Sequence, residues 1–194
     1  MHRFRPPPLR YWKPIQTGIE QDDDTSDVRR LGVCGPDEIL DTGVRLRRPL
    51  SPHLAARLSG QPIDLRGLID SVRQQAGASR WIVEGAGGAL VPVTDSALMV
   101  DAMVALGLPV LIVSRTGLGT INHTLLTLEA LRARSLIVAG VLMVGQPDAE
   151  NRDAIETYGR VPVVGELPPI DPLTPEGLSA WAVANLDRKN ELPL

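Results

Sequence analysis

Lys13 is the first residue of this sequence whose type and surroundings suggest chemistry, and it opens the stretch KPIQTG at 13–18. Of the 20 basic residues, only Lys13 and Lys189 are lysines. A lysine offers a compact point charge where an arginine offers a wide planar fork, so a requirement for an ammonium is one explanation and chance is the other. Pro14 disfavours the helical region for the residue before it, which predicts an extended Lys13 at the end of a strand.

Two further stretches carry carboxylates. In VEGAGG at 83–88, Glu84 ends an apolar run and a glycine-rich loop follows. A carboxylate in this position suits Mg²⁺, which takes one or two carboxylates together with phosphate oxygens and water. A solvated strand end beside a tight turn explains the pattern equally well. In DDDTSD at 22–27, each aspartate alone is more simply part of a solvated loop, although Thr25 or Ser26 could cap a helix carrying Asp27 in its first turn.

Glycines also lead into a predicted helix in the stretch GLGTINH at 117–123. The helix should start near 120–122, where its free N–H groups and the positive end of its dipole would face outward. This helix start is a natural site for a carboxylate or a phosphate. The alternative is an ordinary capped loop.

The elements that position these residues follow from short apolar runs and the segments between them. Strands are predicted at 81–83, 110–113 and 137–143, and more weakly at 161–164. Their lack of strict alternation is typical of strands buried on both faces. Helices are predicted at 51–58, 65–75, 121–134, 151–158 and 175–186. This order predicts an α/β fold with a mainly parallel sheet flanked by helices, whose ligands bind at the carboxyl ends of the strands.

Composition and net charge limit the kinds of protein to which this sequence could belong. A chain of 194 residues favours one domain, 1–194, and 43% hydrophobic with 22% charged residues is ordinary for a soluble globular protein. The net charge of −3 gives no electrostatic reason to expect nucleic acid or a membrane as a partner. Cys34 is the single cysteine, which excludes an intramolecular disulfide and fits a cytoplasmic setting. The longest apolar run, at 106–113, is too short for a bilayer span, and we expect no secretory signal.

Taken together, these stretches resemble the dethiobiotin synthetase family, the ATP-dependent carboxylases of biotin synthesis. The matching pieces are KPIQTG, TSD, SPH, VEGAGG, GLGTINH and GELP, which begin at residues 13, 25, 51, 83, 117 and 165. Their order and spacing agree over residues 11–181. Related amidotransferase-type enzymes share VEGAGG, but the length leaves no room for their extra domain. The resemblance implies a P-loop-NTPase-like fold, Mg²⁺ as cofactor, ATP as substrate and a homodimer.

The implied reaction joins CO₂ to 7,8-diaminononanoate (7,8-diaminopelargonate) as a carbamate, which ATP phosphorylates before the neighbouring amine closes the ring. By resemblance, Lys13 is the catalytic residue and stabilises charge on the carbamate and the transferring phosphoryl group. The metal carboxylates would be Asp27 and Glu84. Substrate binding would fall to Thr17 and, across a dimer interface, to the helix start Gly119, Thr120, Ile121 and Asn122. Nucleotide binding would fall to Glu84, Gly85, Ala86, Gly87, Val144, Gly145 and Pro168.

Two departures from the family pattern bear on activity. The family has an asparagine where Val144 stands, so adenine recognition would rely on backbone groups or be looser. The sequence contains no G-x-x-x-x-G-K-[ST] phosphate loop, and the ten residues before Tyr11, with three consecutive prolines, leave no room for the strand–loop–helix unit that would carry it. We therefore expect the first strand–P-loop–helix unit to be absent, residues 1–9 to be irregular and residues 187–194 to form a tail.

Three explanations for this departure stay open. They are a truncated or mis-assigned start, a decayed gene copy, and a working mode that the family does not use. The alternative function is accordingly a catalytically impaired remnant or a truncated form of the enzyme, acting at most as a non-catalytic dimerising shell.

Overall fold

Residues 8–75, 77 and 79–187 are described by the computed structural model, and the chain divides into two units, Met1–Ala105 and Leu106–Leu194. Each unit is described by itself. The prediction that residues 1–194 form a single domain stays a prediction.

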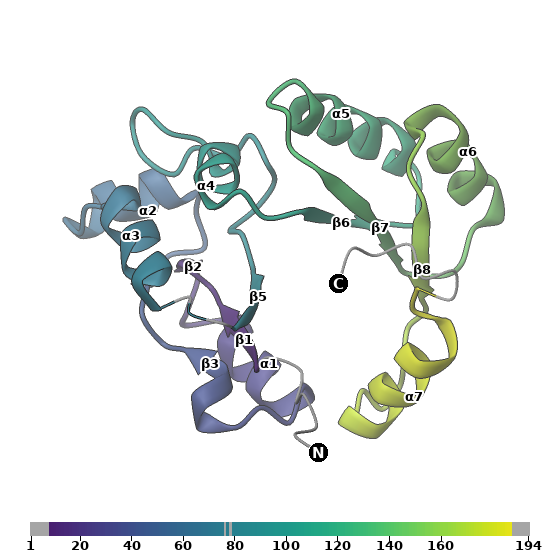
Figure 1. Ribbon diagram of the computed structural model, residues 1–194, viewed down its shortest axis with the longest axis horizontal. Helices are drawn as coiled ribbons and strands as arrows, with labels where there is room; N and C mark the ends of the chain where they lie inside the picture. The colour runs from purple at the N-terminus through teal and green to yellow at the C-terminus, as the bar shows by residue number, and fades with distance from the viewer. Residues whose placement is uncertain (1–7, 76, 78, 188–194) are drawn as a thin grey trace, which may run out of the picture. The chain divides into compact units, whose positions relative to one another are not determined.

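The first unit contains a small three-stranded parallel sheet with β1 (Leu9–Trp12) at its centre (Figure 1), and Lys13 follows directly after β1. Strand β1 lies between β3 (Ile39–Leu40) and β5 (Arg80–Val83), and β2 (Ile15–Thr17) pairs with β4 (Val44–Leu46). All of these pairs are parallel. The helical segments are α1 (Asp24–Leu31), the short 3₁₀ helix η1 (Pro36–Glu38), α2 (Pro52–Ser59), α3 (Leu65–Gln75) and α4 (Met99–Leu106).

The core of the first unit fixes the path of the chain around Lys13. Trp12 and Ile15 are completely buried on either side of it, and the indole N–H of Trp12 donates to the carbonyl of Thr42. Fully burying each of these apolar side chains contributes about 1.5–3 kcal/mol. The buried flanks therefore leave the chain at Lys13 with little freedom to turn away from the sheet edge.

The second unit is a parallel sheet with the order β6–β7–β8. Its strands are β6 (Val110–Arg115), β7 (Val138–Val144) and β8 (Val163–Leu167), and its helices are α5 (Thr120–Arg132), α6 (Ala149–Gly159) and α7 (Pro175–Asn185). Helices α5 and α6 lie side by side along the sheet, and α7 packs against β8 (Figure 1). Leu128, Leu131 and Ile155 of these helices are buried, as are Val141 and Met143 of β7.

The predicted α/β class with parallel strands is confirmed, and α3 has the predicted bounds. Helix α4 and the short strands β2, β3 and β4 were not predicted. Leu9, expected in an irregular segment, begins β1. Residues 1–7 and 188–194 lie outside the described residues.

The predicted burial of the strands on both faces is wrong for β5 and β6. Ile82 on β5 and Val113 on β6 are exposed, by 52% and 64%. Within the described part of the chain, β5 pairs with β1 alone and β6 with β7 alone, so each has a neighbour at one edge only. The apolar runs therefore identified strands correctly but not their surroundings.

The predicted caps of α1 are also corrected. The N-cap is Asp23, whose carboxylate accepts from the backbone N–H of Ser26, so Thr25 and Ser26 lie inside the helix. The physical reason is that an aspartate three residues before Ser26 can satisfy the free N–H groups of the first turn.

Candidate active site

Lys13 lies between two carboxylates directly after strand β1. Its Nζ is 2.8 Å from Glu84 Oε1 and 2.6 Å from Asp24 Oδ2, and it also donates to the carbonyl of Gly85 at 3.3 Å. The Lys13 side chain is only 4% exposed, whereas those of Asp24 and Glu84 are 34% and 41% exposed. An ammonium removed from water in this way needs paired acceptors, and three oxygens supply them.

Strand pairing explains why Lys13 and Glu84 meet although 71 residues separate them. Trp12 is in register with Val83, and the backbone N–H of Glu84 continues the ladder to the carbonyl of Trp12 at 2.9 Å. The residues that follow the two strands therefore emerge at the same edge. The structure thus brings Lys13 and Glu84 together at the carboxyl ends of two parallel strands, whereas Asp27, the other acidic residue of the predicted site, pairs with Arg30.

Tyr11 holds the other oxygen of the same carboxylate. Its hydroxyl donates to Glu84 Oε2 at 2.6 Å. Burial raises the pKa of the Tyr11 phenol, and the hydrogen bond to Glu84 and the charges of Glu84 and Asp24 raise this pKa further. Tyr11 therefore stays a protonated donor. The sequence analysis did not name this residue; its position two residues before Lys13, on the same face of a strand, was the signal that could have found it.

Asp27, the other predicted metal carboxylate, has a different partner. Its Oδ1 accepts from Arg30 at 2.6 Å, one turn along the exposed side of α1. Asp24, in the same first turn of the helix, is the aspartate that contacts Lys13. Sequence reasoning treated Asp24 as part of a solvated run and missed this contact. The assignment of a metal to Asp27 stays a prediction.

The loop after Glu84 comes close to the same ammonium through its backbone. The carbonyl of Gly85 accepts from Lys13, and Ala86 is buried. Gly87 has φ of +78°, and a Cβ there would lie 3.0 Å from Val91, so this turn requires glycine. Thr17 is half-buried at the end of β2, and the Gln16 amide donates to its carbonyl at 3.1 Å.

In the second unit, the predicted helix start lies at the end of β6. Gly119 is the N-cap of α5 with φ of +90°, and Thr120, Ile121 and Asn122 form the first turn. The Thr120 hydroxyl donates to the carbonyl of Arg115 at 2.5 Å and so ties the helix start to the strand. The backbone N–H of Thr120 donates to the carbonyl of Gly117 at 3.1 Å, and the positive end of the helix dipole at this start favours an anion.

Val144, Gly145 and Pro168 lie together at the carboxyl ends of β7 and β8. Val144 is in register with Leu167, and the backbone N–H of Gly145 donates to the carbonyl of Leu167 at 2.9 Å. Pro168 follows Leu167 directly. The structure therefore brings these three predicted nucleotide residues to one edge.

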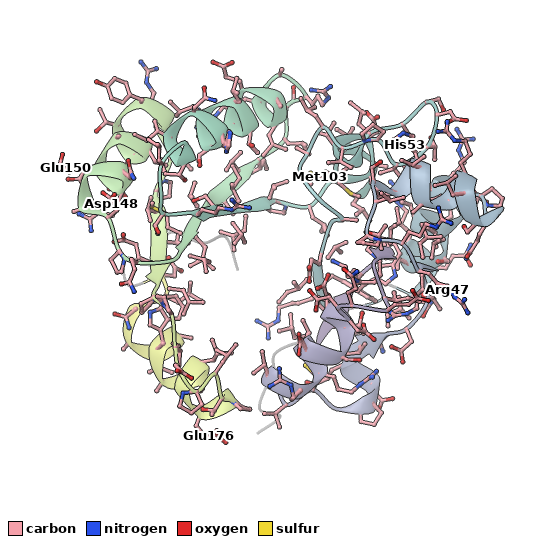
Figure 2. All side chains as sticks on the ribbon, turned by 180° about the vertical axis from the view of Figure 1, so that it is seen from behind. Arg47, His53, Met103, Asp148, Glu150 and Glu176 are labelled. Carbon is pink, nitrogen blue, oxygen red and sulfur yellow. The ribbon has the colours of Figure 1, made fainter. Side chains whose placement is uncertain are left out.

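Asn151 connects the loops at this edge and was not predicted. Its Nδ2 donates to the carbonyl of Thr116 at 2.8 Å and to Asp148 Oδ2 at 2.9 Å. Asp148 is the N-cap of α6 and lies with Glu150 at the start of that helix (Figure 2). The amide thus links the segment after β6 to the segment after β7.

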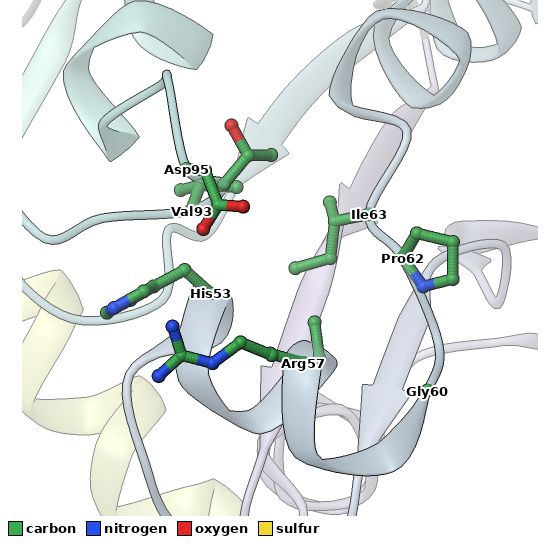
Figure 3. A pocket seen from close by; sticks show the side chains of 9 residues that line it. His53, Arg57, Gly60, Pro62, Ile63, Val93 and Asp95 are labelled. Atoms are coloured by element: carbon green, nitrogen blue, oxygen red, sulfur yellow. The ribbon is translucent and has the colours of Figure 1, made fainter.

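A cavity of about 350 Å³ lies elsewhere in the first unit, between α2 and the segment at 93–95 (Figure 3). The Arg57 and His53 side chains point into it from α2, one turn apart, with Asp95 across from them. Neither Lys13 nor Glu84 lines this cavity, so its volume says nothing about the predicted site.

The donors present favour a metal shared with a ligand over a metal enclosed by protein. In the described ranges, no group of three or more His, Cys, Asp or Glu side chains could hold an ion. The two predicted metal carboxylates, Asp27 and Glu84, would leave most of an octahedral shell to phosphate and water oxygens. Among the same residues, no helix has the length and apolar content that crossing a membrane requires.

Comparison with known proteins agrees with the fold and identifies the family. The model of a family described as AAA domain matches residues 5–177, which places the chain among nucleotide-dependent α/β proteins. The ATP-dependent dethiobiotin synthetase of Bradyrhizobium diazoefficiens is 45% identical over 172 residues, 88% of this chain and 79% of that protein. That of Paramagnetospirillum magneticum is 47% identical over 164 residues, 84% of this chain and 77% of that protein.

A longer relative shows the same match. The biotin biosynthesis bifunctional protein of Bordetella avium is 43% identical over 173 residues, 89% of this chain and 36% of that protein. Identity of this degree over most of two single-function relatives shows the family. The chain belongs to the dethiobiotin synthetase family.

Proposed function

We propose that this chain is an ATP-dependent dethiobiotin synthetase, which joins CO₂ to 7,8-diaminononanoate and closes the ureido ring in biotin biosynthesis. The observation that carries this proposal is the buried Lys13 ammonium held between Glu84 and Asp24 at the carboxyl ends of β1 and β5. The printed activity of the relatives supports it, and ATP is accordingly a substrate.

Lys13 is proposed to stabilise the negative charge of the carbamate and of the phosphoryl group that it receives. A point charge that is already fixed in place acts without reorganising when the reaction occurs, and burial strengthens its effect. Glu84, Asp24 and the Gly85 carbonyl supply that fixation. Because these three oxygens already match the three N–H donors of the ammonium, a substrate oxygen that binds Lys13 has to displace one of them.

Mg²⁺ is the proposed cofactor, with Glu84 and Asp27 as its proposed carboxylates. The chemistry of the donors fits, because Mg²⁺ binds through one or two carboxylates and completes its octahedron with substrate phosphates and water. When bound, Mg²⁺ neutralises charge on the phosphates of ATP. The chain contributes an oriented Glu84 carboxylate and the backbone of the turn at 85–87, which we propose to lie against the phosphates.

The residues of the second unit receive proposed roles from the family resemblance. Val144, Gly145 and Pro168 would contact the nucleotide, through backbone groups at Val144. The helix start at 119–122 would receive the substrate carboxylate across a homodimer interface, and the Thr17 hydroxyl would contact the substrate. A homodimer and a cytoplasmic location belong to the same proposal, as do a diamine and CO₂ as the partners of ATP.

The test is direct synthesis. Purified protein is incubated with the diamine, bicarbonate and Mg-ATP, and dethiobiotin is measured by mass spectrometry beside reactions that omit one component each. We expect product that depends on every component. A protein that melts cooperatively but forms no dethiobiotin and no ADP would contradict the proposal and favour the catalytically impaired alternative.

A further inference from the structure

The end of strand β1 and the residue after it present two side chains to one carboxylate. Tyr11, on β1, and Lys13, directly after β1, are two residues apart, and the Trp12 side chain between them is completely buried. The Tyr11 hydroxyl donates to Glu84 Oε2 at 2.6 Å, and the Lys13 ammonium donates to Oε1 at 2.8 Å. Both oxygens of Glu84 therefore accept a hydrogen bond from the same short segment, residues 11–13.

The Tyr11 ring is itself held firmly. The residue is 6% exposed, in a strand paired on both sides, in register with Ile39 on β3 and with Ile82 on β5. The side chain of Glu84, in contrast, is 41% exposed. The buried Tyr11 hydroxyl on the central strand β1 therefore sets the orientation of the more exposed Glu84 carboxylate.

We infer that Tyr11 is a positioning residue, which acts through Glu84 by fixing the plane of its carboxylate for Mg²⁺ bound with the nucleotide. This inference rests on the proposed function, because it takes Glu84 as a metal carboxylate. Hydrogen-bond partners of ligating carboxylates tune metal affinity, and losing one costs about 10–100-fold in affinity or activity. Without the hydroxyl, Glu84 can rotate about its terminal bond, which has broad rather than well-separated minima.

The decisive variant is Tyr11→Phe, which keeps the buried ring and removes only the hydroxyl. Tyr158→Phe is the matched control, since the chain has two tyrosines and Tyr158 is 75% exposed on α6. For each protein, Mg²⁺ is titrated calorimetrically in the presence of a non-hydrolysable ATP analogue, and the Mg²⁺ concentration for half-maximal dethiobiotin formation is measured in parallel.

We expect Tyr11→Phe to weaken Mg²⁺ binding and to raise its half-saturating concentration by about 10-fold or more, with a smaller change in kcat at saturating Mg²⁺. Tyr158→Phe should match the wild type. Unchanged Mg²⁺ affinity and half-saturation in Tyr11→Phe would overturn the inference. If the wild type forms no dethiobiotin, the proposed function fails, and the calorimetric titration still decides the role of Tyr11.

Two further measurements test whether the effect of Tyr11→Phe on Mg²⁺ binding comes only from a disturbed fold. In the Glu84→Gln background, Tyr11→Phe should cause no additional loss of Mg²⁺ affinity, whereas equal losses in both backgrounds contradict action through Glu84. In Tyr158→Phe protein labelled with 3-fluorotyrosine, the single fluorine resonance belongs to Tyr11. It should shift when Mg²⁺ is added to the nucleotide complex, and a resonance that does not move refutes the inference even if Tyr11→Phe folds poorly.

Discussion

The ammonium of Lys13 lies 2.8 Å from the carboxylate of Glu84, although 71 residues separate them in the sequence. The parallel pairing of β1 with β5 creates this contact, because it brings the residues after both strands to one edge. Asp24 approaches the same ammonium from the first turn of α1, at 2.6 Å.

Lys13→Ala should reduce dethiobiotin formation by about 10²-fold or more, since it removes a fixed charge that stabilises the transition state. Lys13→Arg is the paired variant, and it should also be impaired, because a planar guanidinium does not fit the place of a compact ammonium between two carboxylates. Initial rates at saturating substrates check both. A wild-type rate in Lys13→Ala would contradict a catalytic role for Lys13. A wild-type rate in Lys13→Arg would show that a positive charge alone is sufficient at this position.

Asp24→Asn and Asp27→Asn should differ in their dependence on Mg²⁺. Asp24 contacts Lys13, so its loss should lower kcat without changing the Mg²⁺ concentration for half-maximal rate. Asp27 is the proposed metal carboxylate, so its loss should raise that concentration by about 10-fold or more. We compare the two variants by measuring the rate of dethiobiotin formation over a range of Mg²⁺ concentrations. The reverse pattern would assign the metal to Asp24 and contradict the assignment to Asp27.

Asp23→Ala should lower the free energy of unfolding by about 1 kcal/mol, because Asp23 caps α1. The hydrogen bond from Arg45 is the main cause that lowers the pKa of the Asp23 carboxyl, with further lowering by Ser26. A lowered folded-state pKa stabilises the fold above the ordinary value of 3.8, and this contribution is lost as the pH falls through the folded-state pKa.

Urea unfolding at a series of pH values tests this. The difference between wild type and Asp23→Ala should be full near neutral pH and should shrink below the ordinary aspartate pKa. A difference that stays constant through acid pH would show that the charge of Asp23 is not involved.

Gly145→Ala should destabilise the second unit by about 1–3 kcal/mol. Gly145 has φ of +138°, and a Cβ there would collide with the Thr116 hydroxyl. Gly117→Ala is the control in the same unit, since a Cβ at Gly117 meets nothing within 4 Å. Thermal unfolding compares the two, and nucleotide affinity is measured alongside. Equal stability of both variants would mean that the segment after β7 adapts, contrary to expectation.

The order of strands and helices follows from the sequence because its causes are local. Apolar runs, helix-breaking glycines and caps identified α3 at Leu65–Gln75 with its exact ends, and placed α7 from Thr174 and Pro175. The short strand β3 escaped prediction because two residues carry no periodic signal. The family, too, was readable from the sequence, since its motifs stand at strand ends in the expected order.

What the sequence by itself determined about this protein is therefore the longer strands and most of the helices, the edge at which Lys13 and Glu84 emerge, and the family. Only the tertiary structure decided which aspartate of the acidic run reaches Lys13, because Asp24 and Asp27 differ only in how α1 is docked. The same holds for Tyr11, whose hydrogen bond to Glu84 joins residues 73 positions apart. Such contacts depend on the packing of one strand or helix against another, which no local pattern records.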